Sequence, residues 1–118
     1  MSALLEKIGD LNDLVLQGRA LEAFEKYYHD DVIMQENESS PTIGKEANRQ
    51  REIEFFSAIT EFRTAKPLKI TVGEGGVSMV QWRYDYTHKD WGVRNYCQVS
   101  VQEWKDGKII REQFFYGN

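Results

Sequence analysis

The sequence has 118 residues, which is the size of one domain with one core. Hydrophobic residues make up 41% of it and charged residues 29%, an ordinary composition for a globular protein. The net charge of −4, with Lys and Arg scattered among acids, excludes a nucleic-acid partner. No apolar run approaches the roughly 20 residues of a membrane-spanning helix, so no membrane association is expected.

The N-terminal part carries a helical pattern. Apolar residues recur there at steps of three and four, at Leu4, Ile8, Leu11 and Val15. The spacing predicts a first helix with Ser2 at its N-cap position and its end near Gly18. A second, short helix is predicted over residues 20–28.

The chain then turns from helix to strand at an acidic corner. Residues 32–35 predict a brief strand, which finishes at Glu36. The turn-rich segment ENESSPTIG leads into a third helix, predicted over residues 45–59. We expect the corner to form one wall of a small-molecule pocket, with Glu36 at its lip.

The C-terminal half is strand-like. Four runs rich in β-branched and aromatic residues predict strands, over residues 68–72, 78–87, 93–104 and 108–116. Asp106-Gly107 between the last two runs predicts a tight hairpin. Helices first and long strands afterwards predict an α+β fold, a curved antiparallel sheet closed by helices into a cone with an open mouth.

Three stretches resemble one protein family. GRALEAFEKYYHDDVIM, PTIGKEA and VSVQEWKDGKIIREQFFY are similar to the nuclear-transport-factor-2-like superfamily and, within it, to the SnoaL-like group. The resemblance implies that residues 1–118 form one cone-shaped α+β barrel with three N-terminal helices and a central pocket. It also implies a homodimer paired through the outer face of the sheet. This fold hosts isomerases, hydrolases, cyclases and non-catalytic binding modules, so no single function follows.

Ketosteroid isomerases of this superfamily place a carboxylate base at the end of the strand that follows the acidic corner. Glu36 takes that position. A base of this kind needs a partly desolvated carboxylate with a raised pKa. The other two groups of these enzymes have no counterpart, because their positions fall at the apolar Leu11 and near a misplaced Glu103. Steroid-type isomerisation is therefore not expected.

Limonene epoxide hydrolase is similar to this sequence at Arg83 and Asp85, which match its Arg-x-Asp pair. Strand alternation puts the two side chains on one face of the sheet, about 7 Å apart. The second aspartate of that enzyme corresponds to Phe114, and Glu112 is the nearest acid on the same face. Its water-holding residues correspond to Met34 and Glu36. Only the Arg-x-Asp part of that site is therefore present.

Polyketide cyclases offer a third comparison. The stretch WRYDYTH, residues 82–88, is similar to their W-x-F-x-G-T-H pattern. This similarity implies that His88 helps a carboxylate to remove a proton next to a carbonyl. The position of His88 at a strand end favours the alternative, a histidine on the surface.

The strand over residues 78–87 has two faces, and one of them must line the pocket. If Arg83 and Asp85 point inward, Trp82, Tyr84 and Tyr86 form an outward aromatic stripe suited to a dimer interface. If the aromatic side chains point inward, they line the pocket and the charges lie on the surface. The hydrolase-like register favours the charged side chains inward.

These patterns favour a small, mostly apolar organic ligand bound in the cone. The candidates for acid–base catalysis are Glu36, Arg83 and Asp85. The candidates for ligand contacts are Tyr28, Met34, Glu112 and Phe114. The alternative is a non-catalytic ligand-binding or protein-interaction module of the same fold, so the sequence leaves open whether the protein is an enzyme.

Several kinds of chemistry have no signal in the sequence. It has no Gly-rich phosphate loop, no Cys-x-x-Cys and no Gly-x-Ser-x-Gly, so no cofactor, metal or covalent intermediate is expected. Cys97 is the single cysteine and is expected to be a buried thiol. The N-terminal segment carries acids and lacks the basic start of a signal peptide, which predicts a cytoplasmic protein.

Overall fold

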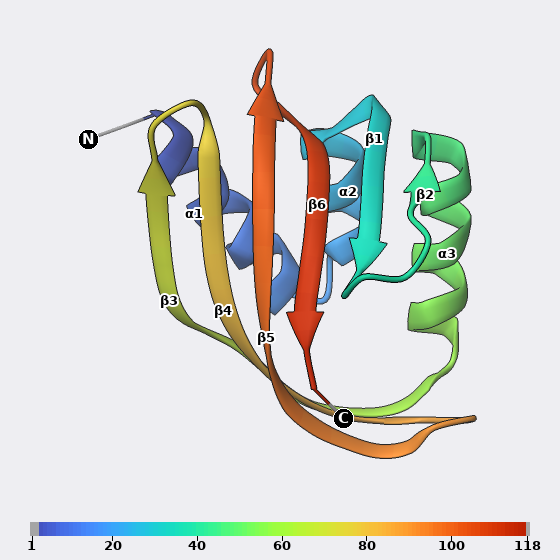
Figure 1. Ribbon diagram of the computed structural model, residues 1–118. Helices are drawn as coiled ribbons and strands as arrows, with labels where there is room; N and C mark the ends of the chain where they lie inside the picture. Colours follow the sequence, from blue (N-terminus) through green and yellow to red (C-terminus); the bar gives the residue numbers. More distant parts are fainter. Residues whose placement is uncertain (1–2, 118) are drawn as a thin grey trace.

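The computed structural model describes residues 3–117 as three helices and a six-stranded sheet (Figure 1). In chain order the elements are α1 (Ala3–Leu16), α2 (Ala20–Tyr27), β1 (Tyr28–Glu36), β2 (Thr42–Ile43), α3 (Lys45–Ser57), β3 (Ile59–Gly73), β4 (Val77–His88), β5 (Gly92–Lys105) and β6 (Lys108–Tyr116). Among these residues, no helix combines the length and the apolar character needed to cross a membrane.

Helix α1 forms because its apolar residues share one face. Ile8, Leu11 and Leu14 are buried in the core. The helix ends before Gly18, which has a φ of 75°, a left-handed conformation that glycine adopts without strain. This turn lets the Arg19 N–H donate to the Leu14 carbonyl at 2.8 Å. The predicted N-cap, Ser2, lies outside the described residues.

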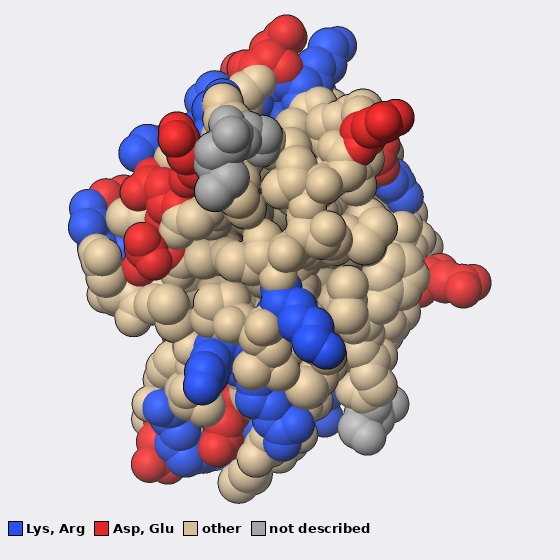
Figure 2. Space-filling model, turned by 90° about the vertical axis from the view of Figure 1, so that its left-hand side faces the viewer, with Lys and Arg blue, Asp and Glu red and all other residues tan. Residues whose placement is uncertain are grey.

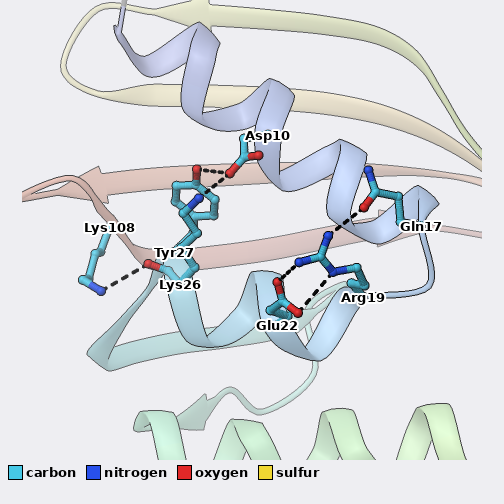
Figure 3. A network of polar contacts seen from close by, with 7 residues as sticks. All are labelled: Asp10, Gln17, Arg19, Glu22, Lys26, Tyr27 and Lys108. Atoms are coloured by element: carbon cyan, nitrogen blue, oxygen red, sulfur yellow. Dashed lines mark hydrogen bonds and ion pairs between the residues drawn. The ribbon is translucent and has the colours of Figure 1, made fainter.

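Polar contacts hold α2 against α1. The Asp10 carboxylate accepts hydrogen bonds from the Tyr27 hydroxyl and from the Lys26 ammonium group, the latter at 2.8 Å (Figure 3). Lys108 Nζ donates to the Lys26 carbonyl at 3.2 Å, which connects the same helix to the start of β6. These contacts fix the end of α2 and so position Tyr28, the first residue of β1.

The strand order is β2-β1-β6-β5-β4-β3, and the helices lie on the concave side of the sheet (Figure 1). The antiparallel prediction is wrong for one pair, because β1 runs parallel to β6. Every other neighbouring pair is antiparallel. The curved sheet is not closed into a barrel, since β2 and β3 remain its two edges. The α+β class and the cone-like shape are confirmed, with the helices covering the open side.

Strand β3 is the element that differs most from prediction. It starts at Ile59, directly after α3, whereas the sequence predicts a strand over residues 68–72 only. Its first half is rich in polar residues and is followed by Pro67, and both features hide the strand signal. The register shifts at three places along the β3–β4 pair, one of them between Pro67 and Lys69. Such irregularities bend a strand and give the sheet its curl.

As an edge strand, β3 also carries protective charges. It faces the viewer in Figure 2, where Lys and Arg side chains gather in the lower half of the surface. The strand contributes Arg63, Lys66 and Lys69, and Pro67 has no N–H to offer to another strand. Charged residues and proline on an edge discourage pairing with a second sheet.

Candidate functional site

A cavity of about 2,100 Å³ lies on the concave side of the sheet. Its wall includes side chains from all three helices and from β1, β4, β5 and β6. The exposed side chains of Arg51 and Lys89 also line it, so the cavity opens to solvent. The question for function is which polar groups face its interior.

Strand β4 turns its aromatic face, not its charged face, toward the cavity. Trp82, Tyr84 and Tyr86 line the cavity wall. Arg83 and Asp85 lie on the outer face, so the predicted inward orientation of these two side chains is wrong. Asp85 accepts a hydrogen bond from Arg63 on the neighbouring strand at 2.8 Å. Arg83 lies on the outer face beside Cys97, with 3.6 Å between Nη1 and Sγ.

Burial of apolar area explains this orientation. A large aromatic side chain buries roughly 150–250 Å², which stabilises the fold by about 4–6 kcal/mol. An exposed ion pair contributes about 0–1 kcal/mol. Because neighbouring residues of a strand point to opposite faces, burying Trp82 and Tyr86 places Arg83 and Asp85 outside.

Glu112 on β6 forms the floor of the cavity, and only 2% of its surface is exposed. Its Oε1 accepts a hydrogen bond from the Tyr28 hydroxyl, and its Oε2 accepts one from Gln102 Nε2 at 2.8 Å. Burial raises the pKa of the Glu112 carboxyl to about 7, although both hydrogen bonds act in the opposite direction. Glu112 is therefore a carboxyl group that changes its charge near neutral pH.

A row of hydrogen bonds across three strands orients Gln102. Trp104 Nε1 donates to Ser78 Oγ at 2.9 Å, and the Ser78 hydroxyl lies 2.6 Å from Gln102 Oε1. Because the Ser78 hydroxyl donates to the amide oxygen, the amide nitrogen of Gln102 must face Glu112. Ser78, Gln102 and Glu112 are direct cross-strand neighbours on β4, β5 and β6. The sheet register itself thus assembles this network.

Glu52 on α3 is a second cavity-lining carboxyl group. Its pKa is raised to about 8, mainly by burial and then by the negative charges of Glu112 and Glu36. The nearby Arg51 acts in the opposite direction. Two carboxyl groups with raised pKa values therefore share one cavity, and at neutral pH Glu52 is mostly protonated.

Glu36 lies at the end of β1, where the sequence places it, and lines the cavity. Its Oε1 accepts a hydrogen bond from the Tyr116 hydroxyl at 2.9 Å. Its Oε2 pairs with Arg51 at 2.9 Å. Tyr28, Met34 and Phe114 line the same cavity, and the roles predicted for these residues and for Glu36 stay predictions.

With this geometry in place, sequence comparison identifies the family. A model of the SnoaL-like domain matches residues 5–116. The chain belongs to the SnoaL-like domain family. A comparison with curated protein sequences finds no match.

Solved structures agree with this membership. A protein from Mesorhizobium loti, provisionally named as a SnoaL-like polyketide cyclase, is 28% identical, with 98% of this chain and 100% of that chain covered and a TM-score of 0.86. An epoxide hydrolase of M. tuberculosis described as LEH-like is 12% identical, with 97% and 82% covered and a TM-score of 0.76. A cystatin-fold protein from Novosphingobium aromaticivorans is 16% identical, with 97% and 98% covered and a TM-score of 0.78. The last two likenesses show the fold alone.

Aromatic side chains line another part of the cavity of this SnoaL-like domain. His88 is buried and stacks on Trp91, with 3.8 Å between ring centroids, so the favoured surface position of this histidine is wrong. Phe55 on α3 contacts Tyr86, His88 and Trp91. The turn before β5 brings Trp91 back over His88, which no alternation pattern in the sequence indicates.

The sequence did not predict two of the cavity residues, Glu52 and Arg94. Glu52 lies four residues after the buried Asn48 and three before Phe55, so a helical spacing places all three on one face. This helical spacing is the sequence feature that could have predicted Glu52 as a cavity residue. Arg94 lies two residues before Tyr96 on β5, so both side chains point to the same face of the sheet. This alternation alone does not tell which face is inside. Within residues 3–117, no three His, Cys, Asp or Glu side chains gather in a way that could hold a metal ion.

Proposed function

We propose that this SnoaL-like domain catalyses proton transfer to and from a small, mostly apolar organic molecule, with Glu52 as the group that exchanges the proton. The observation that carries the proposal is the pair of cavity carboxyls, Glu52 and Glu112, with pKa values of about 8 and 7. Perturbed carboxyl groups gathered in one cavity are typical of acid–base sites.

The two carboxyl groups differ in access. Glu112 is almost fully buried, and both of its oxygens accept hydrogen bonds from the protein. Glu52 is less buried and lines the same cavity. Glu52 is therefore the better donor to a bound molecule, while Glu112 acts from the cavity floor by raising the Glu52 pKa through its negative charge.

A protonated Glu52 can deliver a proton to an oxygen atom of the ligand at neutral pH. The oxygen can belong to a carbonyl, an epoxide or a leaving hydroxyl group, and the resulting carboxylate then accepts a proton from the ligand or from water. Isomerisation, ring closure and epoxide opening all need this step. The relative provisionally named as a SnoaL-like polyketide cyclase supports ring closure within this range.

The cavity wall supports an apolar ligand. Phe24, Met34, Trp82, Tyr84 and Phe114 contribute apolar or aromatic surface around the two acids. A ligand that covers these side chains excludes water from Glu52, and the electrostatic interactions within the site become stronger as a result.

Carbon-13 NMR of labelled glutamate carboxyls tests the proposal. The Glu52 signal, identified by its loss in Glu52→Gln, is expected to titrate near pH 8. Glu112→Gln should lower that pKa, because it removes the strongest nearby negative charge. Glu54→Gln, which removes an exposed carboxylate from the same helix, should leave it unchanged. A Glu52 pKa near 4.5 in the wild-type protein would refute proton exchange and favour a non-catalytic ligand-binding module.

A further inference from the structure

Arg94 has an unusual environment for an arginine inside a protein. It lies on β5 directly opposite Tyr86, so its side chain shares the inner face of the sheet and lines the cavity. Its Nε atom is buried and has no hydrogen-bond partner within the described part of the chain. Buried polar groups nearly always have a partner, and a missing one requires an explanation.

The other arginines of the described chain make a useful comparison. Five of them pair with carboxylates, namely Arg19, Arg49, Arg51, Arg63 and Arg111. Arg83 has no such pair, but it lies exposed on the outer face, where water satisfies its donors. Arg94 alone combines a cavity position with the lack of a carboxylate partner among residues 3–117.

Within the described part of the chain, the Arg94 guanidinium lies over the face of an aromatic ring. Its Cζ atom lies 5.0 Å from the centroid of the Tyr96 ring. This cation–π contact fixes the plane of the guanidinium but uses none of its N–H donors. The planar fork of donors matches the two oxygens of a carboxylate. Because Nε is buried, the terminal Nη donors are the ones that suit a carboxylate entering the cavity, and the described residues supply no such carboxylate.

Flat aromatic walls surround this position. Phe55 meets the edge of Tyr86 at 5.6 Å between centroids, and it lies 6.1 Å from Trp91. The hydroxyls of Tyr86 and Tyr96 are hydrogen-bonded to each other at 2.8 Å. A planar apolar group fits among such rings, because aromatic pairs prefer stacked or edge-to-face contact.

We propose that Arg94 is an anion-binding residue that holds the carboxylate of an aromatic acid in this cavity. The ligand is then amphipathic: its carboxylate binds Arg94, and its apolar body lies along the aromatic wall toward Glu52. Calling this ligand a substrate rests on the proposed function, but its binding does not. Arg94 and Lys89 favour an anion at this end of the cavity, although the exposed Asp90 on the same turn also lines it.

Two probes of nearly the same shape separate charge from packing. 2-Naphthoate carries a carboxylate, and 2-acetonaphthone carries an uncharged acetyl group in its place. Binding of each is measured at pH 7 by NMR titration, including the Arg94 Nε–H signal. The wild-type protein should bind 2-naphthoate at least about tenfold more tightly, the effect of one charged hydrogen-bonded contact.

Matched arginine variants show which residue causes the preference for 2-naphthoate. Arg94→Gln should abolish the preference for 2-naphthoate, and Arg94→Lys should retain part of it because the charge remains while the planar fork is lost. Arg83→Gln removes an arginine from the outer face and should leave the preference intact. Equal affinity of the wild-type protein for both probes, lack of binding, or an equal loss of both in Arg94→Gln would overturn the proposal.

The result of the naphthoate-binding experiment is independent of the Glu52 pKa measurement. If the naphthoate preference is missing while the Glu52 pKa stays near 8, only the anion site is wrong. If the preference is present while Glu52 titrates near 4.5, only the catalytic proposal fails. Binding of an aromatic carboxylate would then assign the cavity to a non-catalytic module.

Discussion

At the scale of single residues, Glu52 and Glu112 make folding depend on pH. Both carboxyl groups have raised pKa values in the folded protein, about 8 and about 7, against an ordinary value of 4.5. Between pH 4.5 and 8 the folded state therefore keeps protons that the unfolded state has released. Stability from these groups is fully present below pH 4.5 and is lost as the pH rises through 7 and 8.

We expect the free energy of unfolding to fall between pH 5 and pH 9, as measured by urea denaturation. Glu112→Gln should flatten this decline by up to about 3 kcal/mol, because a pKa difference between 4.5 and about 7 corresponds to that amount. Glu54→Gln should keep the wild-type slope. A stability that rises over this pH range, or an unchanged slope in Glu112→Gln, would contradict the raised pKa of Glu112.

Single residues also mark the limit of what the sequence could reveal about the site. The resemblance to known enzymes predicted pocket positions for Glu36, Glu112 and Phe114, and all three line the cavity. The inward orientation predicted for Arg83 was wrong. It rested on a likeness of three residues, whereas the orientation of the strand is set by the burial of its aromatic side chains. Glu52 stayed hidden because its helix is dominated by charged residues, which gives little amphipathic signal.

At the scale of elements, two buried asparagines play opposite parts. Asn48 on α3 donates its side-chain amide to the carbonyls of Val32, Thr42 and Gly44, at 3.2, 3.0 and 2.8 Å. It thereby fastens the helix that carries Glu52 to β1 and to the segment around β2. Asn12 on α1 is equally buried, but neither its Oδ1 nor its Nδ2 has a partner among the described residues.

Replacing each asparagine with leucine, which has nearly the same shape, should change stability in opposite directions. Asn12→Leu removes two unsatisfied polar atoms and should raise the free energy of unfolding by about 1–3 kcal/mol. Asn48→Leu removes the side-chain amide from three carbonyls, of which those of Val32 and Gly44 keep a backbone N–H donor, and should lower it by about 1–3 kcal/mol. Urea denaturation of the two variants at one pH measures both effects. A loss of stability in Asn12→Leu would indicate that water satisfies this amide.

Elements differed in how far local sequence could predict them. The hairpin between β5 and β6 was predicted and is confirmed, because Asp106 and Gly107 both adopt the positive φ values, 53° and 78°, that a two-residue turn needs. Strand β3 was only partly predicted, because most of its side chains are exposed and follow no alternation. The parallel pairing of β1 with β6 depends on contacts between segments far apart in the sequence, which no local pattern encodes.

At the scale of the whole molecule, the inward aromatic face leaves a different set of side chains outside. Met79 and Phe115 are each 41% exposed, and Val99 and Val101 lie between them on the neighbouring strand. Val99 pairs with Phe115, and Met79 pairs with Val101, so these four residues form a continuous apolar patch on the outer sheet face. A patch of this kind is typical of a surface that another protein covers.

We therefore expect a homodimer that buries this outer patch, with a mass in solution twice the 13.8 kDa of the chain. Phe115→Lys places a charge on the patch and should yield the monomer mass in light scattering coupled to size-exclusion chromatography, because an unpaired charge in an apolar interface is costly. Ile43→Lys changes an apolar residue that is 69% exposed on β2 and should leave the dimer intact. The patch would lose its role if the wild-type protein were monomeric at 100 µM, or if Phe115→Lys stayed dimeric. Because the cavity lies on the opposite face of the same strands, Phe115→Lys should still bind 2-naphthoate, which separates assembly from ligand binding.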